Sequence, residues 1–296
     1  MGYNQSMDRI KDKEYPIVSV KTRDGLSLFG LINEVENSEI ILINVHGTGS
    51  NFFCEEFEYA FYREIPKLEI SSLFTNNRGS YAMDSWQDAG ACLEIFEDSV
   101  KDIDTWIEFA KNKGYKKIIL QGHSYGTEKV VYYMNKGKYA NDVITLILLG
   151  FADSYGTQKN YEKTIKTDLM AEAMVKMKQG KGYELLTGER RAQSGELPIS
   201  SKTYLNYFSE GSELSKVIPL RNGGSLPMIK NIRVPILAVI GDHDEYTIVP
   251  IKLAMDLIKK ENKLAKVFQI KGSGHTYNGK QEELIKIVVD FLRDKV

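Results

Sequence analysis

The segment Gly122-His123-Ser124-Tyr125-Gly126 is the feature that most restricts how this chain can fold. It follows an apolar strand pattern at residues 117–121 and precedes a helical pattern at 125–135. A G-x-S-x-G between a strand and a helix predicts a tight turn, the nucleophile elbow, which exposes a serine hydroxyl. The glycines suit such a turn because side chains there would collide with the neighbouring strand and helix. A glycine-rich turn without chemistry remains the alternative.

Length and composition indicate a globular protein with one large core or two small ones. The chain has 296 residues, of which 42% are hydrophobic. Its 39 basic and 40 acidic residues give no electrostatic reason to expect nucleic acid or an anionic membrane as a partner. Two cysteines are too few for a disulfide framework, no apolar run reaches membrane-spanning length, and residues 1–14 lack a signal peptide's apolar stretch. We therefore expect a cytoplasmic protein.

Strand and helix patterns alternate along most of the chain. Residues 16–21 and 26–32 flank Asp24-Gly25, a hairpin signal, and Ile40–Val45 is typical of a strand buried on both faces. Further strands are predicted at 71–75, 117–121, 143–149, 235–240 and 266–270, and helices at 97–112, 125–135, 249–260 and 281–294. This alternation predicts an α/β fold with a mostly parallel, doubly wound sheet and helices on both faces.

The alternation is interrupted between residues 153 and 230, where no convincing core strand is found. An amphipathic helix is predicted at 161–178 and a shorter one at 203–208, which begins after Ser200 or Ser201 as its cap. We therefore expect residues 1–152 and 231–296 to form the core, with 153–230 as an inserted helical cap. Its aromatic residues, Tyr204 and Phe208 among them, either pack in the interior or line a pocket.

A reactive serine needs a base to take its proton and a third group to orient that base. His275 follows the last predicted strand, so it should lie on the same rim of the sheet as Ser124. Strand 235–240 ends in Gly241-Asp242-His243-Asp244, which offers two candidate carboxylates on that rim. A loop histidine and two turn or capping aspartates are the alternatives without chemistry.

A developing oxyanion also has to be bound if the serine transfers an acyl group. His46-Gly47-Thr48-Gly49 follows the buried strand 40–45 on the same rim, and glycines let a backbone approach a substrate. The backbone amides of Thr48 and Tyr125 are therefore the predicted oxyanion hole. We interpret His46 as a structural residue that holds its loop.

With these pieces in place the chain resembles the α/β-hydrolase superfamily. The resemblance rests on the order Ser124, aspartate, His275, on the upstream His-Gly-Thr-Gly, and on the inserted segment, and it covers almost the whole chain. The superfamily pattern puts the acid three residues after the glycine that ends the strand. It thus implies Asp244 as the catalytic acid, with Asp242 bonding turn amides.

The turn Asn76-Asn77-Arg78-Gly79 sits where many members of the superfamily have Asp-x-Arg-Gly after the fourth strand. Together with the His-Gly-Thr-Gly segment, it looks like an uncharacterised branch that includes siderophore esterases. That narrower resemblance implies that Arg78 fixes its loop and does not contact the substrate.

The expected function is that of a serine hydrolase that cleaves a carboxylic ester or lactone through an acyl-enzyme. Ser124, Asp244 and His275 would be catalytic, and Tyr204 or Phe208 would help the inserted segment to set substrate choice. A thioesterase or acyltransferase with the same triad, or a non-catalytic binding protein of this fold, are the alternatives. No metal ion or organic cofactor is expected, the partner is a small-molecule ester, lactone or thioester, and the oligomeric state stays open.

Overall fold

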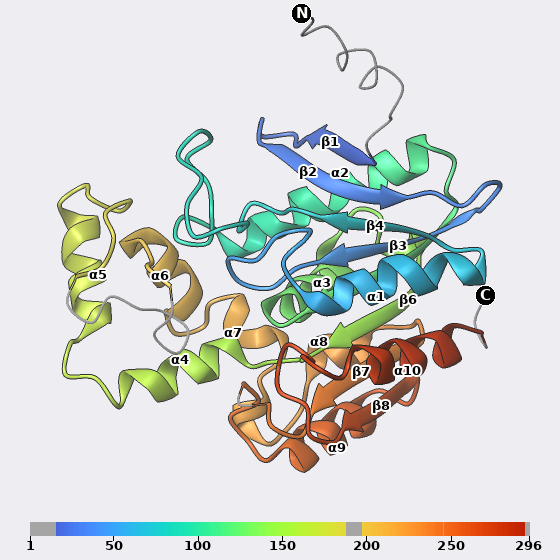
Figure 1. The fold of residues 1–296 in the computed structure, drawn as a ribbon. Helices are drawn as coiled ribbons and strands as arrows, with labels where there is room; N and C mark the ends of the chain where they lie inside the picture. Colours follow the sequence, from blue (N-terminus) through green and yellow to red (C-terminus); the bar gives the residue numbers. More distant parts are fainter. Residues whose placement is uncertain (1–15, 188–196, 245, 294–296) are drawn as a thin grey trace, which may run out of the picture.

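The computed structural model describes residues 16–187, 197–244 and 246–293, in which eight strands form one twisted sheet (Figure 1). The strands lie in the order β1-β2-β4-β3-β5-β6-β7-β8; β2 runs antiparallel to both neighbours, and the six from β4 to β8 are parallel. Their bounds are β1 Ile17–Lys21, β2 Ser27–Asn33, β3 Ile40–Val45, β4 Ser71–Thr75, β5 Lys117–His123, β6 Val143–Leu149, β7 Ile236–Gly241 and β8 Ala265–Ile270. The predicted sheet is confirmed, including the hairpin at Asp24-Gly25, where Gly25 has a positive φ of 93°.

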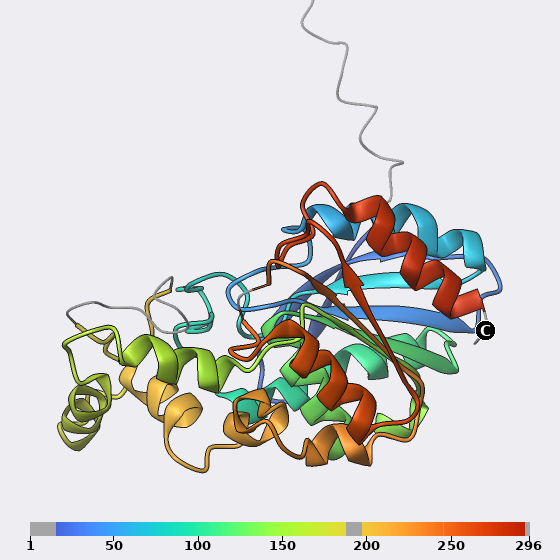
Figure 2. The same ribbon diagram turned by 90° about the horizontal axis from the view of Figure 1, so that it is seen from below.

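Helices cover both faces of the sheet (Figure 2). One face carries α1 (Glu56–Glu64) and α10 (Gln281–Arg293), and the other carries α2 (Ser99–Asn112), α3 (Tyr125–Lys136), α8 (Pro227–Asn231) and α9 (Ile251–Glu261). The central strands β3, β5, β6 and β7 are buried almost throughout, which explains their continuous apolar runs. Short 3-10 turns lie at Ile65–Leu68, Phe96–Asp98, Ala140–Asp142 and Leu220–Asn222.

The segment between β6 and β7 is helical and lies beyond one end of the sheet (Figure 1). It comprises α4 (Ser154–Glu162), α5 (Leu169–Lys178), α6 (Ser201–Phe208) and α7 (Leu214–Val217), followed by α8 against the sheet. Because β6 and β7 are hydrogen-bonded neighbours, with Leu146 opposite Ile236, the chain leaves and re-enters the sheet at adjacent strands. In the part of the chain that the structure describes, every helix is too short or too polar to span a membrane.

The single helix predicted at 161–178 is wrong, because the structure has two helices there. The first, α4, begins at Ser154 and ends at Glu162, and the second, α5, begins only at Leu169. Thr164 closes the first helix by donating its hydroxyl to the carbonyl of Tyr161 at 2.7 Å. Asp168 starts the second by accepting the amide of Ala171 at 2.9 Å. The apolar periodicity ran through this break and concealed it. The other predicted elements agree with the structure to within two residues at most ends; the end of the last helix, 294, lies outside the described residues.

Candidate active site

Ser124 stands at the turn between β5 and α3 in a strained backbone conformation, with φ 56° and ψ −127°. Such angles are rare for residues other than glycine. A Cβ on Gly122 would lie 2.3 Å from the carbonyl oxygen of Gly126, and one on Gly126 would lie 2.2 Å from that of Val45. Both glycines are therefore required by the close approach of strand, turn and helix. The turn has the geometry of a nucleophile elbow.

The loop after β3 packs directly against this turn. A Cβ on Gly47 would lie 2.9 Å from the Cβ of Ser124, so only glycine fits beside the serine. His46 holds the loop, because its Nδ1–H donates to the carbonyl of Gly47 at 2.7 Å and its Nε2 lies 2.7 Å from Ser80 Oγ. Burial, with the nearby charge of Lys129, lowers the pKa of His46 to about 3, so the ring is neutral. This is the structural position expected for His46.

The structure places Asp244, and not Asp242, against His275. Nδ1–H of His275 donates to Oδ2 of Asp244 at 2.8 Å, and the other carboxylate oxygen accepts the amide of Tyr246 at 3.0 Å. The side chain of Asp244 is fully buried. Asp242 instead accepts the amides of Gly272 and Ser273 at 2.7 and 3.2 Å, which ties the ends of β7 and β8 together.

The other ring nitrogen of His275, Nε2, is buried and makes no hydrogen bond to any described residue. The bond from Nδ1–H to Asp244 fixes the tautomer in which Nε2 carries the lone pair. The ring of Tyr246 lies 4.4 Å from that of His275, centroid to centroid, and helps to hold it in place. A base with a free lone pair is therefore oriented by a carboxylate at the carboxyl end of the parallel strands.

Ser124, His275 and Thr48 line one pocket with a volume of about 210 Å³, here called the reactive pocket. Asp244 lies behind His275. Tyr125 does not line the pocket; it follows Ser124 as the first residue of α3, where the first amides have no partner within the helix. Its side chain is buried against Phe96 and Tyr207. The pocket brings Ser124, His275 and Thr48 together, with Asp244 behind His275, and the oxyanion hole of Thr48 and Tyr125 stays a prediction.

The remaining walls of the reactive pocket were not found from the sequence. Most of them carry hydroxyl groups, and one, Glu55, carries a carboxylate; they are Ser50, Glu55, Ala152, Ser154, Thr157, Leu197, Tyr246 and Thr276. Tyr246 follows Asp244 by only two residues, and Glu55 lies between the predicted oxyanion loop and α1. Tyr246 and Glu55 could have been predicted as pocket residues only from their nearness in sequence to the predicted site loops.

Tyr204 and Phe208 do not line the reactive pocket, so the expectation that they contact the substrate is corrected. Both are completely buried in α6, with ring centroids 5.3 Å apart. The hydroxyl of Tyr204 donates to Glu162 of α4. They hold the helices of the inserted segment together, because the apolar face of α6 turns inward, toward the core.

A fully buried ion pair links this segment to α3, the helix that follows Ser124. Nζ of Lys129 on α3 lies 2.6 Å from Oε1 of Glu94, and both side chains are fully buried. The hydroxyl of Tyr207 on α6 donates to the other oxygen of Glu94 at 2.9 Å. Lys129 also donates to Oδ1 of Asn77 at 3.0 Å. Nζ of Lys129 also lies 4.7 Å from the ring centroid of Tyr125. Because the two buried charges are paired within this network, α3, α6 and the turn after β4 depend on one another.

Arg78 fixes the loop after β4. Its guanidinium lies 2.7 Å from the buried carboxylate of Asp102, 3.2 Å from Asp24 and 3.3 Å from Asp98. Its backbone amide donates to Asp102 as well, at 2.8 Å. Arg78 does not line the reactive pocket.

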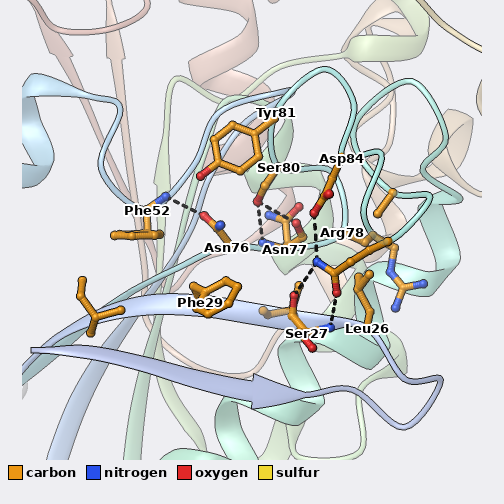
Figure 3. Close-up of a pocket in the computed structure, with 14 residues that line it drawn as sticks. Leu26, Ser27, Phe29, Phe52, Asn76, Asn77, Arg78, Ser80, Tyr81 and Asp84 are labelled. Carbon is orange, nitrogen blue, oxygen red and sulfur yellow. Dashed lines mark hydrogen bonds between the residues drawn. The ribbon is translucent and has the colours of Figure 1, made fainter.

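A second pocket, of about 360 Å³, is lined in part by the loop after β3 (Figure 3). The aromatic rings of Phe29, Phe52 and Tyr81 border it, and the amide of Phe52 donates to Asn76 Oδ1 at 3.0 Å. The loop after β3 thus lines the reactive pocket with Thr48 and Ser50 and this second pocket with Phe52. Ser124 and His275 do not line the second pocket.

Solved structures with the same fold include several esterases. Est1E from Butyrivibrio proteoclasticus, solved with ferulic acid bound, is 17% identical with a TM-score of 0.67, over 94% of this chain and 98% of that one. The Pyrococcus furiosus esterase Pf2001 is 16% identical with a TM-score of 0.61, over 95% and 93%. The carboxylesterase CesB from Bacillus subtilis is 15% identical with a TM-score of 0.60, over 96% and 94%. At these identities the likeness establishes the fold.

A search of curated proteins gave no match. A family model described as a protein of unknown function, DUF1749, matches residues 92–293, which include Ser124, Asp244 and His275. The fold and this match agree, since the sheet order, the elbow and the rim loops are those of an α/β hydrolase. The chain belongs to the DUF1749 family and has the α/β-hydrolase fold.

Proposed function

We propose that this protein is a serine hydrolase that cleaves a carboxylic ester or lactone through an acyl-enzyme intermediate. One observation carries the proposal: His275 is oriented by a buried aspartate through Nδ1, while Nε2 is left without a partner in the pocket that Ser124 lines. A buried, unpartnered nitrogen is costly, and a proton taken from Ser124 satisfies it.

The chemistry follows from these positions. Ser124 Oγ attacks the carbonyl carbon while His275 Nε2 takes its proton, and Asp244 stabilises the resulting imidazolium. The amides of Thr48 and Tyr125 bind the oxyanion of the tetrahedral intermediate. His275 returns the proton to the leaving alkoxide, and the alcohol departs. Water then attacks the carbonyl carbon of the acyl-enzyme while His275 takes a proton from it. His275 returns this proton to Ser124 Oγ as the acid is released.

The choice of an ester as the bond that is cleaved draws on the structural neighbours. Pf2001 is named as an esterase and CesB as a carboxylesterase, and Est1E was solved with ferulic acid bound. The reactive pocket supports the choice, because its hydroxyl groups can solvate both the alcohol and the acid that an ester releases.

We also propose that residues 153–230 form a cap over the reactive pocket, with 1–152 and 231–296 as the core. Ser154, Thr157 and Leu197 of this segment line the pocket. Ser154 is bonded to the core through its amide, which donates to the buried Glu128 of α3 at 3.1 Å. The residues through which the segment affects substrate choice are therefore Ser154, Thr157 and Leu197.

Covalent labelling tests the proposal directly. A fluorophosphonate should add one phosphonyl group per chain, and peptide mass spectrometry should find it on Ser124. Ser124→Ala should remove both the label and the turnover of p-nitrophenyl acetate. A folded wild-type protein that takes no label would instead be a binding protein of this fold. Adding an alcohol or thiol as competing acceptor separates hydrolysis, which yields the acid, from acyl transfer.

A further inference from the structure

Glu55 places a carboxylate beside the candidate catalytic groups. It is partly buried, lines the reactive pocket with Ser124 and His275, and is close enough to His275 for the two to interact electrostatically. The pKa of Glu55 is raised above its ordinary value, chiefly by burial, and His275 and the nearby Ser50 hydroxyl offset part of that rise. No lysine or arginine stands among the described residues that line this pocket. Any charge that the pocket contributes before reaction is therefore negative.

The pocket also holds an acceptor that lacks a donor. His123 is 3% exposed, and its Nε2–H donates to the carbonyl of His275 at 3.0 Å. Its Nδ1 is then an acceptor, and it makes no hydrogen bond to any described residue. Burial lowers the pKa of His123 to about 3, so the ring stays neutral and cannot supply positive charge. Both groups, Glu55 and His123, favour a ligand that is positive or donates hydrogen bonds.

A third pocket, of about 440 Å³, adjoins this one and shares Glu55 with it. Its walls combine aromatic rings, those of Phe53 and Tyr59 among them, with the carboxylates of Glu55 and Glu56. No basic side chain lines it among the residues described. Phe53 is 74% exposed, which leaves its face open to a ligand, whereas the guanidinium of Arg63 lies 5.9 Å from the ring centroid of Tyr59. Aromatic faces together with carboxylates are the surroundings that bind alkylammonium groups.

We propose that the reactive pocket and this aromatic-acidic pocket form one binding site for esters that carry a cationic, ammonium-type group, with Glu55 as the residue that selects them. The inference deepens the proposed function and rests on it. The ester carbonyl lies at Ser124, and the cationic group lies at Glu55 among the aromatic rings. An anionic ester would meet the uncompensated charge of Glu55 and is disfavoured.

A helix-starting role is the competing explanation for Glu55. It occupies the position before α1, and its backbone amide donates to Oε2 of Glu58 at 3.1 Å. A carboxylate at that end also interacts favourably with the helix dipole. Such a role predicts that neutralising Glu55 lowers stability and leaves the ranking of substrates alone. The proposed role predicts a change in ranking.

Pairs of esters that differ only in charge separate the two roles. For the alcohol side, 2-(trimethylammonio)ethyl acetate is compared with 3,3-dimethylbutyl acetate. For the acyl side, methyl trimethylammonioacetate is compared with methyl 3,3-dimethylbutanoate. The quaternary nitrogen cannot titrate, and its carbon counterpart has nearly the same shape. The measured quantity is the ratio of kcat/KM for the cationic ester to kcat/KM for the neutral one.

Three variants are measured at pH 7.5 after subtraction of spontaneous hydrolysis. Glu55→Gln should lower the ratio for one of the pairs about tenfold, as expected for loss of one nearby charge. Phe53→Leu, which removes an aromatic face at an exposed position, should lower the ratio about two- to fivefold. Glu36→Gln removes the same charge from an exposed residue that lines neither pocket, and should leave the ratio unchanged.

The outcomes separate failure of the inference from failure of the proposed function. Neutral esters that are hydrolysed with ratios unaffected by Glu55→Gln would overturn the inference alone. Equal losses for all four esters together with a lower Tm would assign Glu55 to the start of α1 and overturn it too. A protein that neither hydrolyses a neutral ester nor takes the fluorophosphonate label contradicts the proposed function, and the inference falls with it.

Discussion

Two serines stand before helices in this protein and serve opposite purposes. In the inserted segment, Ser200 starts α6 with extended backbone angles, and its hydroxyl accepts the amide of Thr203 at 3.2 Å. In the core, Ser124 starts α3 with a positive φ, and its side chain makes no capping hydrogen bond. Serine favours the first position because its oxygen satisfies an otherwise unpaired helix amide. At the second position that benefit is absent.

The inserted segment and the rim of the core differ in the same way in how their helices begin. Asp153 and Asp168 start α4 and α5 by accepting amides of Gly156 and Ala171 at 2.8 and 2.9 Å. At Ser124 the turn is held by backbone instead, since its amide donates to Leu149 at 2.9 Å and its carbonyl accepts from Thr127 at 2.8 Å. The inserted segment thus uses polar side chains for stability. The rim of the core leaves a polar side chain unused where a chemical role is proposed.

Ser124→Ala should therefore separate turnover from stability more than any other change. Loss of the nucleophile should lower kcat for p-nitrophenyl acetate by about 10⁶-fold. The unfolding free energy should stay within about 0.5 kcal/mol, because no cap is lost and alanine meets the same backbone strain. Urea unfolding and initial rates on one preparation measure both. A marked loss of stability would mean that Ser124 caps α3 in solution.

The two aspartates after β7 allow the second comparison within the rim itself. Asp244→Asn should keep the geometry but favour the wrong histidine tautomer, which lowers kcat by about 10⁴-fold. Asp242→Asn should have a far smaller effect on kcat, because Asp242 bonds only turn amides. Comparing kcat for the two variants decides the assignment. A large loss at Asp242 with a small one at Asp244 would reverse it.

Much of the rim could be predicted because local sequence determines it. Apolar runs locate the strands, the glycine spacing locates the elbow, and Asp242 and Asp244 differ in their distance from Gly241. Parallel strands then bring the loops that follow them to one edge. The start of α6 could be predicted for the same reason, since a serine before a helical pattern is a local signal.

The pocket walls and the packing of the inserted segment could not be predicted in this way. Glu55 and His275 are 220 positions apart and meet only through the sheet. In the sequence, a buried tyrosine such as Tyr204 cannot be told from one that faces a ligand, because the amphipathic side chain suits both positions. The pairing of Lys129 with Glu94 depends on the docking of α3 beside the loop after β4. The spacing of apolar residues in the sequence does not indicate that docking.

The start of α1 is a third case, in which a core helix begins on a buried carboxylate. Glu58 is 5% exposed, and its oxygens accept Nδ2 of Asn44 at 2.9 Å and the amide of Glu55 at 3.1 Å. Burial raises the pKa of Glu58 to about 8. Above pH 4.5 the unfolded chain releases this proton while the folded protein keeps it. The unfolding free energy therefore falls as pH rises from about 4.5 through 8.

Glu58→Gln should remove that dependence. Between pH 5 and pH 8 the stability of the variant should rise relative to wild type by on the order of 3 kcal/mol, whatever the offset caused by the lost hydrogen bond. Urea unfolding of both proteins at the two pH values measures this difference, and effects of other titrating groups cancel in it. A parallel pH dependence of the two proteins would show that Glu58 is ionised in the folded state.

The smallest predicted effect belongs to the serine that serves as a cap. Ser200 is completely buried, and Ser200→Ala should lower the unfolding free energy by about 1 kcal/mol, because the amide of Thr203 loses its partner. Ser200→Gly is the matched control, since glycine at this position costs only about a few tenths of a kcal/mol. Turnover of p-nitrophenyl acetate should stay within about threefold in both variants, as Ser200 does not line the reactive pocket. Urea unfolding gives the stability, and initial rates give the turnover. Reduced turnover at unchanged stability would give Ser200 a part in the site and remove the contrast with Ser124.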